Sequence, residues 1–315
     1  MNSFARIDPQ LVDVVLPFEH DGYPESLAAE DTRDNLMMAA GASTRAFPDS
    51  WWVEPEDWAD KARDNDTHHT WPMNTIDRFT NQHPSHECTT HSLTRCAEGA
   101  RNLQIGVLFP NGPKKNYRYD ESEEYGSVWL SPLSIYAEAN PQQWGGANVR
   151  QVMEIACKRG FLPETIQPRD YGFKHALHGT TGQGNNNQAS GPWVKVSHFP
   201  AGWQETAANF KPLEVIFPES WEQAVCCVLN SRFVGVGRNG HAIPWGQWNA
   251  KENVMAYPDS YDVIRYDSLK TVKSAWRGSF AIATMTTPDD WQEPAPKLTW
   301  VSGARSISSL ELGDA

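Results

Sequence analysis

The spacing of apolar residues predicts several helices in the first half of the chain. Residues 88–103 carry apolar side chains every three to four positions, which predicts an amphipathic helix with one apolar face. Ser131-Pro132 is a typical helix start and predicts a helix to about residue 140. A third helix is expected over residues 149–160, ending at a glycine, and a fourth over residues 26–40.

The pattern changes after residue 193 to short segments typical of β-strands. We expect strands at residues 194–196, 213–217, 233–237, 261–266 and 279–285. Asn239-Gly240 predicts a hairpin turn, so a return strand should begin at His241. One helix, residues 221–230, interrupts the strands and has a capping-box pattern at Ser220 and Gln223.

This segregation of helices and strands predicts an α+β protein with two lobes and a site in the cleft between them. We expect an N-terminal extension at 1–41, a main domain at 42–300 and a polar tail at 301–315. The helical lobe should reach to about residue 175, and the β lobe should occupy about 190–300. Residues 178–191, rich in Gly, Asn and Gln, should form a flexible excursion.

Composition and charge exclude several classes of function. The chain has 315 residues, of which 39% are hydrophobic, and a formal net charge of −12, which argues against a nucleic-acid-binding surface. No apolar stretch approaches the roughly 18 residues of a membrane span, and the N-terminus lacks the apolar core of a signal peptide. A cytoplasmic or virion location is therefore expected, rather than secretion by a classical signal peptide.

The cysteines favour a reducing compartment. The chain has five, an odd number, and Cys226 and Cys227 are adjacent, so a disulfide framework is not expected. Fourteen tryptophans, many in polar company, suit half-buried anchors in loops or at interfaces.

No metal or cofactor is expected. His86 and His91 are five residues apart, so they would not share a helix face as zinc-peptidase ligands do. The G-x-G-x-x-G string at residues 235–240 leads into a strand rather than a helix, so it does not fit a phosphate-binding loop.

The candidate chemistry centres on Cys88 in the first turn of its helix. A helix N-terminus favours thiolate over thiol, and Gln82, six residues upstream, could direct its amide at an oxyanion formed on that sulfur. A cysteine nucleophile needs a base and a group that orients the base, for which His241 and Asp267 are the candidates. The alternatives are a buried, inert cysteine, a polar turn histidine and a solvated aspartate.

Several motifs together resemble the papain-like cysteine peptidases. The family reads Asn-Gln-Gly-Ser-Cys-Gly-Ser-Cys-Trp-Ala-Phe-Ser around its nucleophile, and residues 81–92 read Asn-Gln-His-Pro-Ser-His-Glu-Cys-Thr-Thr-His-Ser without a gap. Residues 130–132 resemble its Leu-Ser-Pro/Glu helix start, and Gly145-Gly146 resembles the Gly-Gly stretch that lines its substrate groove. Residues 240–243 resemble its Gly-His-Ala-Val, and 264–268 the strand leading to its Asn-Ser-Trp.

The resemblance covers about residues 45–285 and implies a papain-like two-lobe fold. It implies a thiol hydrolase that cleaves a peptide or other amide bond through an acyl-enzyme. The implied roles are nucleophile for Cys88, oxyanion donor for Gln82, base for His241 and orienting group for Asp267, with Gly145 and Gly146 contacting the substrate.

The chain departs from the family pattern at several of these positions. Asp267 stands where the family has Asn, and Leu269 replaces the Trp two positions later. Thr89 replaces the Trp after the nucleophile, and Ser85 replaces a Cys, so that disulfide is absent.

A structural role in a large assembly is the alternative function. The family is normally made with an inhibitory propeptide, whereas residues 1–41 alone precede the matching region here. Together with the abundant loop tryptophans and the polar tail, this favours a papain-fold component of an assembly such as a tailed-phage virion, with other subunits as partners. A peptide or protein is the expected partner of the enzyme.

Overall fold

The structure, a computed structural model, describes residues 7–13, 42–80, 82, 87–115, 126–139, 147–164, 196–238, 240–286 and 305–306. Several expectations fall outside these residues. They are the helix at 26–40, the excursion at 178–191, the Gly145-Gly146 pair, and the polar tail except for residues 305–306.

The described residues form the following helices and strands. The helices are α2 (Trp58–His68), α3 (Cys88–Gln104), α5 (Pro132–Ala139), α6 (Val149–Arg159), α8 (Trp203–Ala208), α9 (Trp221–Leu229) and α10 (Leu269–Ala275). The strands are β1 (Ser43–Arg45), β2 (Val107–Leu108), β3 (Pro212–Ile216), β4 (Val234–Arg238), β5 (His241–Trp245), β6 (Gln247–Asn249), β7 (Val254–Asp259), β8 (Val263–Ser268), β9 (Phe280–Met285) and β10 (Arg305–Ser306). Short 3-10 turns include η1 (Pro9–Leu11), η4 (Pro72–Thr75) and η6 (Val196–His198).

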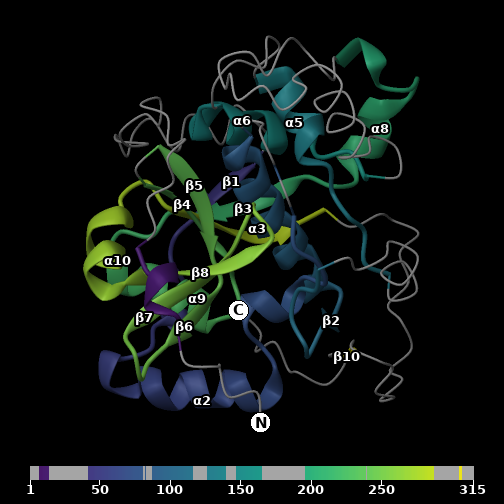
Figure 1. The fold of residues 1–315 in the computed structure, drawn as a ribbon. Coiled ribbons are helices and arrows are strands. Elements are labelled where there is room, and N and C mark those ends of the chain that lie inside the picture. Colours follow the sequence, from purple (N-terminus) through teal and green to yellow (C-terminus); the bar gives the residue numbers. More distant parts are fainter. Residues whose placement is uncertain are drawn as a thin grey trace.

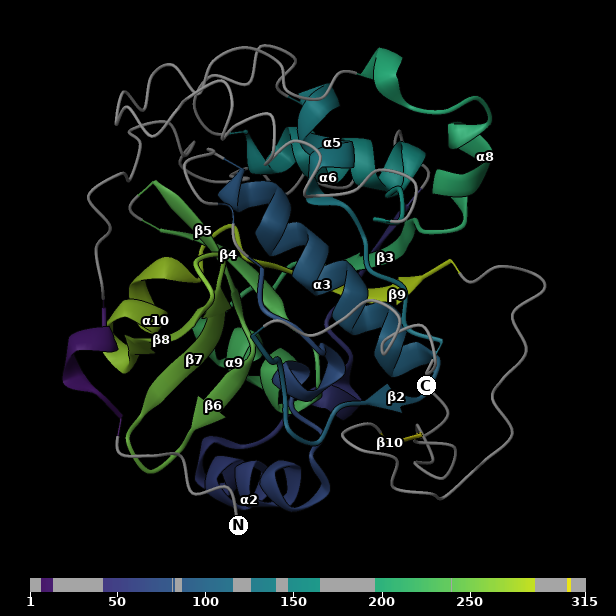
Figure 2. The same cartoon turned by 45° about the vertical axis from the view of Figure 1, so that its right-hand side comes forward.

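The fold is of the α+β class, as the sequence predicted. A five-stranded sheet has the order β1-β3-β9-β4-β5, and a three-stranded sheet has the order β6-β7-β8. Neighbouring strands are antiparallel except for β1 and β3, which are parallel. In Figure 2, strands β4–β8 lie on one side of α3, and helices α5 and α6 lie on the other.

Helix α3 is the central element of the molecule (Figure 1). The sequence predicted one apolar face, but every residue from Cys88 to Leu103 is buried. The polar side chains of α3 are buried together with the apolar face because several of them are paired inside the protein rather than solvated. Glu98, for example, binds Arg95 and accepts a hydrogen bond from the Leu130 amide.

The segment from residue 42 to the end of α2 packs against the β-rich half, including its helix α9. Strand β1 joins the five-stranded sheet, and the Trp58 ring of α2 lies edge-on to Trp221 and Trp248 at centroid distances of 5.4 and 5.7 Å. This part of the chain, placed in the helical lobe by the sequence, therefore contacts the β-rich half.

Strands β5 and β7 bring two separate sheets together near the N-terminus of α3. Gly246 separates β5 from β6, so the chain passes directly from one sheet to the other. Both β5 and β7 are buried along their full lengths, and they contact each other, while β5 also packs on α3. The ends of α3, β5 and β7 thus supply neighbouring side chains from three different elements.

Candidate active site

Cys88 is the first residue of α3 and is 93% buried, with 7% of its surface exposed. Its thiol hydrogen-bonds with the His241 side chain and with the Ala242 backbone, and it also interacts with the Thr89 hydroxyl. The position at the start of a long helix adds the partial positive charge of the helix N-terminus. The structure thus brings Cys88 of the helical half and His241 of the sheet half together, and their catalytic roles stay a prediction.

His241 begins β5, directly after the turn that the sequence predicted. Its register partner in the hairpin is Arg238 on β4, and Gly240 in the turn has a φ of 74°, a left-handed conformation that suits glycine. The Nε2 atom of His241 lies 2.9 Å from Oδ1 of Asp259. Because Nε2 is engaged by the carboxylate, Nδ1 is the ring nitrogen that remains for the Cys88 sulfur.

Asp259, the last residue of β7, is the carboxylate that faces His241. Its side chain is fully buried, and its second oxygen, Oδ2, accepts a hydrogen bond from Nε of Arg265 at 2.5 Å. The sequence analysis did not identify Asp259 or Arg265. Strand β7 was not predicted, so the residue at its end was not considered.

Asp267, the orienting group expected from the sequence, lies elsewhere, and that assignment was wrong. It sits within β8 rather than after it, and its Oδ2 accepts a hydrogen bond from Nε1 of Trp245 at 2.7 Å. Its Oδ1 lies 3.0 Å from a guanidinium nitrogen of Arg238. Asp267 and Asp259 point to the same face of the sheet, but only Asp259 reaches the imidazole.

Gln82 is buried and is held by Ser260, the residue after Asp259. The backbone N–H of Gln82 donates to the Ser260 backbone carbonyl at 2.8 Å, and the Ser260 hydroxyl donates to the side-chain Oε1 of Gln82 at 2.5 Å. Since the carbonyl end of the side-chain amide is taken by Ser260, its Nε2 end points the other way. One two-residue segment, Asp259-Ser260, therefore contacts both the base candidate and the oxyanion-donor candidate.

The surroundings of His241 include one aromatic ring. The Tyr261 ring lies 6.0 Å from the imidazole, with an interplanar angle of 36°. Residues 259–261 read Asp-Ser-Tyr, which is the Asn-Ser-Trp pattern with an acid and a different aromatic. Gly145 and Gly146 lie outside the described residues, but the next residue, Ala147, accepts a hydrogen bond from the Thr89 hydroxyl at 2.9 Å.

The electrostatics of the pair favour a thiolate and an imidazolium. Burial opposes ionisation of Cys88, but the hydrogen bond and charge of His241 outweigh it and lower the pKa of the thiol. Burial would likewise lower the pKa of His241, but hydrogen bonds with Asp259 and Cys88 raise it to about 10. Burial of Asp259 is outweighed by His241 and Arg265, which lower the pKa of the carboxyl.

The other four cysteines have the opposite character. Burial raises the pKa of each of their thiols, and none has a histidine among the groups that influence it; they are Cys96, Cys157, Cys226 and Cys227. Cys88 is thus the one cysteine of the chain whose thiol pKa is lowered, which is the signature of a reactive rather than an inert cysteine.

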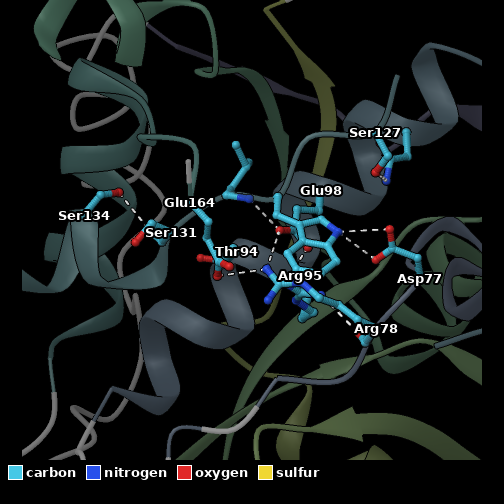
Figure 3. Close-up of polar contacts among 12 residues, drawn as sticks. Asp77, Arg78, Thr94, Arg95, Glu98, Ser127, Ser131, Ser134 and Glu164 are labelled. Carbon is cyan, nitrogen blue, oxygen red and sulfur yellow. Dashed lines mark hydrogen bonds and ion pairs between the residues drawn. The ribbon is translucent and has the colours of Figure 1, made fainter. Parts of the chain in front are cut away.

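A buried cluster of charges lies farther along α3 and connects it to the segment that leads to Gln82 (Figure 3). Arg95 binds Glu98 at 2.5 Å, and Arg78 binds Glu164 at 2.9 Å and lies 3.7 Å from Glu98. The Arg78 guanidinium also stacks on the Trp129 ring, 3.8 Å from its centroid. The cluster fixes the 77–80 segment against the helix that carries Cys88.

Metal ligands, a separate cavity and membrane-spanning helices are the other features that could mark a site in these residues. Within the described part of the chain, no three His, Cys, Asp or Glu side chains gather in a metal-binding arrangement. A cavity of about 760 Å³ between α2, β6 and the loop after β2 is lined by Trp71, Met73 and Gln247, but by none of the site residues named above. None of the described helices combines the length and apolarity that crossing a membrane requires.

Comparisons with known proteins find similar solved structures, two of which are described here. No protein-family model and no curated protein matches the chain. One similar structure is xylellain, a cysteine protease from Xylella fastidiosa, with 12% identity, a TM-score of 0.46, and coverage of 68% of this chain and 85% of that one. Another is digestive procathepsin L 3 from the larval midgut of Tenebrio molitor, with 11% identity, a TM-score of 0.46, and coverage of 67% of both chains.

Proposed function

We propose that this chain is a papain-like cysteine peptidase that hydrolyses a peptide or another amide bond. The observation that carries the proposal is the hydrogen-bonded series Cys88–His241–Asp259, assembled from α3, β5 and β7. Nucleophile, base and orienting carboxylate are the three parts that thiol catalysis needs. Asp259 takes the place that the sequence analysis gave to Asp267.

The first half of the reaction forms an acyl-enzyme. The Cys88 thiolate attacks the substrate carbonyl carbon, and the carbonyl π electrons move onto oxygen to give a tetrahedral oxyanion. The Cys88 backbone amide at the start of α3 and the Gln82 side-chain amide are the donors for that oxygen. The oxyanion collapses, the C–N bond breaks, and His241 protonates the departing amine, leaving a thioester on Cys88.

The second half releases the acid. The neutral His241 imidazole takes a proton from water, and the resulting hydroxide attacks the thioester carbon. Collapse of this second tetrahedral species breaks the C–S bond and returns the thiolate, with the imidazolium beside it. Asp259 holds the same imidazole orientation in both halves, because its carboxylate accepts from Nε2 and leaves Nδ1 toward the sulfur.

An epoxysuccinyl peptide tests the proposal directly. Such a reagent is opened by a thiolate, and the alkoxide that forms needs a proton from a neighbouring acid. We expect one adduct, located on Cys88 by peptide mass mapping, and none in Cys88→Ser or His241→Ala. Cys157→Ala is the matched control, since it removes a buried thiol of raised pKa and should leave labelling unchanged. Equal labelling of wild type and His241→Ala would contradict the proposal.

The bond that is cleaved is tested with the same variants. Fluorogenic peptide amides of varied sequence should be hydrolysed by the wild type and not by Cys88→Ser, which defines the substrate class as peptide or protein. The alternative role as a component of a viral assembly stays a prediction.

A further inference from the structure

The two oxygens of the Asp259 carboxylate bind two different cations. Oδ1 faces Nε2 of His241 at 2.9 Å, and Oδ2 faces Nε of Arg265 at 2.5 Å. An ionised carboxylate has only acceptors, whereas an imidazolium N–H and a guanidinium N–H are donors. Both interactions are therefore charge-assisted hydrogen bonds that a single buried group receives at once.

The sheet register explains why Arg265 reaches Asp259. In the β7–β8 pairing, Tyr257 is opposite Arg265 and Asp259 is opposite Val263, so all four side chains share one face. Arg265 is one diagonal step from Asp259 on that face. Its side chain is 14% exposed, while that of Asp259 is 0% exposed, so the arginine covers the carboxylate from the solvent side.

The charges around His241 balance only when Arg265 is included. A thiolate at Cys88 and a carboxylate at Asp259 carry two negative charges, and imidazolium and guanidinium carry two positive ones. Asp267, on the same face, pairs with Arg238 of β4, and Arg238 also donates to the Tyr257 hydroxyl. Tyr261 adds a ring beside the imidazole but no charge at neutral pH.

We propose that Arg265 is a positioning residue for His241 and acts through Asp259. Arg265 and Asp259 form a pair in which replacing either residue alone impairs the placement of the His241 imidazole. This inference rests on the proposed function. Arg265 donates a hydrogen bond to Oδ2 of Asp259 and so fixes the orientation of the carboxylate. In that orientation, Oδ1 binds Nε2 of His241 and holds the imidazole toward Cys88.

The substitution Asp259→Asn illustrates why Asp259 and Arg265 act as a unit. An asparagine at residue 259 would offer one acceptor oxygen to two donors, His241 Nε2–H and Arg265 Nε–H. One donor would then face the amide NH₂ group, which is itself a donor. Removing the Arg265 donor as well would let the single amide oxygen turn to His241, so the second substitution should repair the first.

The test is a double-mutant cycle with two thiol reagents. Epoxysuccinyl inactivation needs both the thiolate and a placed imidazolium proton, whereas iodoacetamide alkylation expels iodide and needs only the thiolate. Both rates are measured at pH 6 on full-length protein for Arg265→Met, Asp259→Asn and the double variant. Arg277→Met is the matched control, since it removes an exposed arginine that lies over Trp276.

We expect Arg265→Met to slow epoxysuccinyl inactivation by about tenfold, the effect of one lost hydrogen bond, while iodoacetamide alkylation is unchanged. In the Asp259→Asn background, the same substitution should raise the epoxysuccinyl rate by about tenfold. Arg265→Lys, which keeps the charge, should fall between wild type and Arg265→Met. Arg277→Met should match the wild type with both reagents.

An arginine with a merely structural role would lower the rate in both backgrounds, so a loss in the Asp259→Asn background would overturn the inference. Nitrogen-15 spectra of histidine-labelled protein give a second readout that does not depend on reactivity. The Nε2 resonance of His241, assigned by its absence in His241→Gln, should move in Arg265→Met. An unmoved resonance would also overturn the inference.

The same data separate this inference from the proposed function. If the wild-type protein is not labelled on Cys88 at pH 6, or is labelled equally in His241→Ala, the proposed function fails. If labelling depends on His241 but Arg265→Met equals wild type, only the role of Arg265 fails. Should Arg265→Met not fold, as judged by circular dichroism, Arg265→Lys replaces it in both the rate measurements and the nitrogen-15 spectra. An epoxysuccinyl rate equal to the wild type together with an unmoved Nε2 resonance in Arg265→Lys would then overturn the inference.

Discussion

The Nε2 atom of His241 lies 2.9 Å from Oδ1 of Asp259, across the junction of two separate sheets. The imidazole is the first side chain of β5, and the carboxylate is the last of β7. Each is buried, and each alters the protonation of the other, since Asp259 raises the pKa of His241 and His241 lowers the pKa of Asp259. This contact supports the orienting role that we propose for Asp259.

Substitution of the two buried aspartates should separate their roles. Asp259→Ala removes the acceptor and the charge beside the imidazolium, so the thiolate–imidazolium pair is weakened and iodoacetamide alkylation of Cys88 at pH 6 should slow by about tenfold or more. Asp267→Asn still accepts from Trp245 but loses the ion pair with Arg238. It should lower the free energy of unfolding by about 3 kcal/mol and leave alkylation at the wild-type rate.

Urea denaturation and alkylation kinetics on the same samples measure both quantities. A slowed alkylation in Asp267→Asn, together with a wild-type rate in Asp259→Ala, would return the orienting role to Asp267.

The helices and the hairpin could be predicted because their signals are local. Ser220 caps α9 by accepting from the backbone N–H of Gln223, and Gly160, with a φ of 93°, ends α6 as its position predicted. The hairpin strands β4 and β5 follow from the turn at Gly240 and the short runs that flank it. The apolar spacing of residues 88–103 placed Cys88 at a helix start, and the hairpin turn placed His241 at a strand start.

Strand β7 was missed for physical reasons, and with it the acid. All six of its residues are buried, so it lacks the alternation of a half-exposed strand, and Pro258 lies inside it. The segment after it offered a signal that was not used. Asp259-Ser260-Tyr261 keeps an aromatic third residue as in Asn-Ser-Trp, whereas Asp267-Ser268-Leu269 does not. Arg265 and the burial of Glu98 depend on register and packing, which no local pattern contains.

The hydroxyl of Ser260 should matter for oxyanion binding and not for thiol reactivity. It fixes the Gln82 amide by donating to Oε1 at 2.5 Å. Ser260→Ala removes one hydrogen bond, so the affinity for a peptide aldehyde, whose hemithioacetal oxygen occupies the oxyanion position, should fall about tenfold. Gln82→Ala, which removes the donor itself, should cost about a hundredfold or more.

The control for Ser260 is the equivalent serine that follows the other aspartate. Ser268 caps α10 by accepting from the Thr271 amide, so Ser268→Ala should weaken that helix but leave aldehyde affinity unchanged. Iodoacetamide alkylation should be unchanged in all three variants because it forms no oxyanion. Equal aldehyde affinity in wild type and Ser260→Ala would show that Gln82 is held without the hydroxyl.

In the pH profile of epoxysuccinyl inactivation, the fall in rate at alkaline pH should report the deprotonation of His241. The reactive state has a deprotonated Cys88, with a pKa below its usual value, and a protonated His241, with a pKa of about 10. The rate of epoxysuccinyl inactivation should therefore rise at a pH below 9, the usual value for a cysteine, and fall above about pH 10, where the proton donor is lost.

Iodoacetamide separates the two limbs of this profile. Because iodide leaves without a proton, alkylation of Cys88 should keep the acid limb and show no fall above about pH 10. A fall with both reagents would indicate alkaline unfolding, and an alkaline limb near pH 6.5 would indicate an unperturbed histidine.

The buried charge cluster on α3 should dominate the stability of the helical half. Glu98 binds Arg95 and lies near Arg78, and its Oε1 also accepts from the Leu130 amide. Glu98→Gln keeps the size of the side chain but leaves two buried guanidinium groups facing one fewer carboxylate. The free energy of unfolding in urea should fall by about 3 kcal/mol or more.

Glu214→Gln is the control, since its ion pair with Arg45 is partly exposed and should contribute less than about 1 kcal/mol. An equal loss in the free energy of unfolding for the two variants would show that the buried cluster contributes no more stability than a partly exposed ion pair. In that case, apolar packing holds the 77–80 segment against α3.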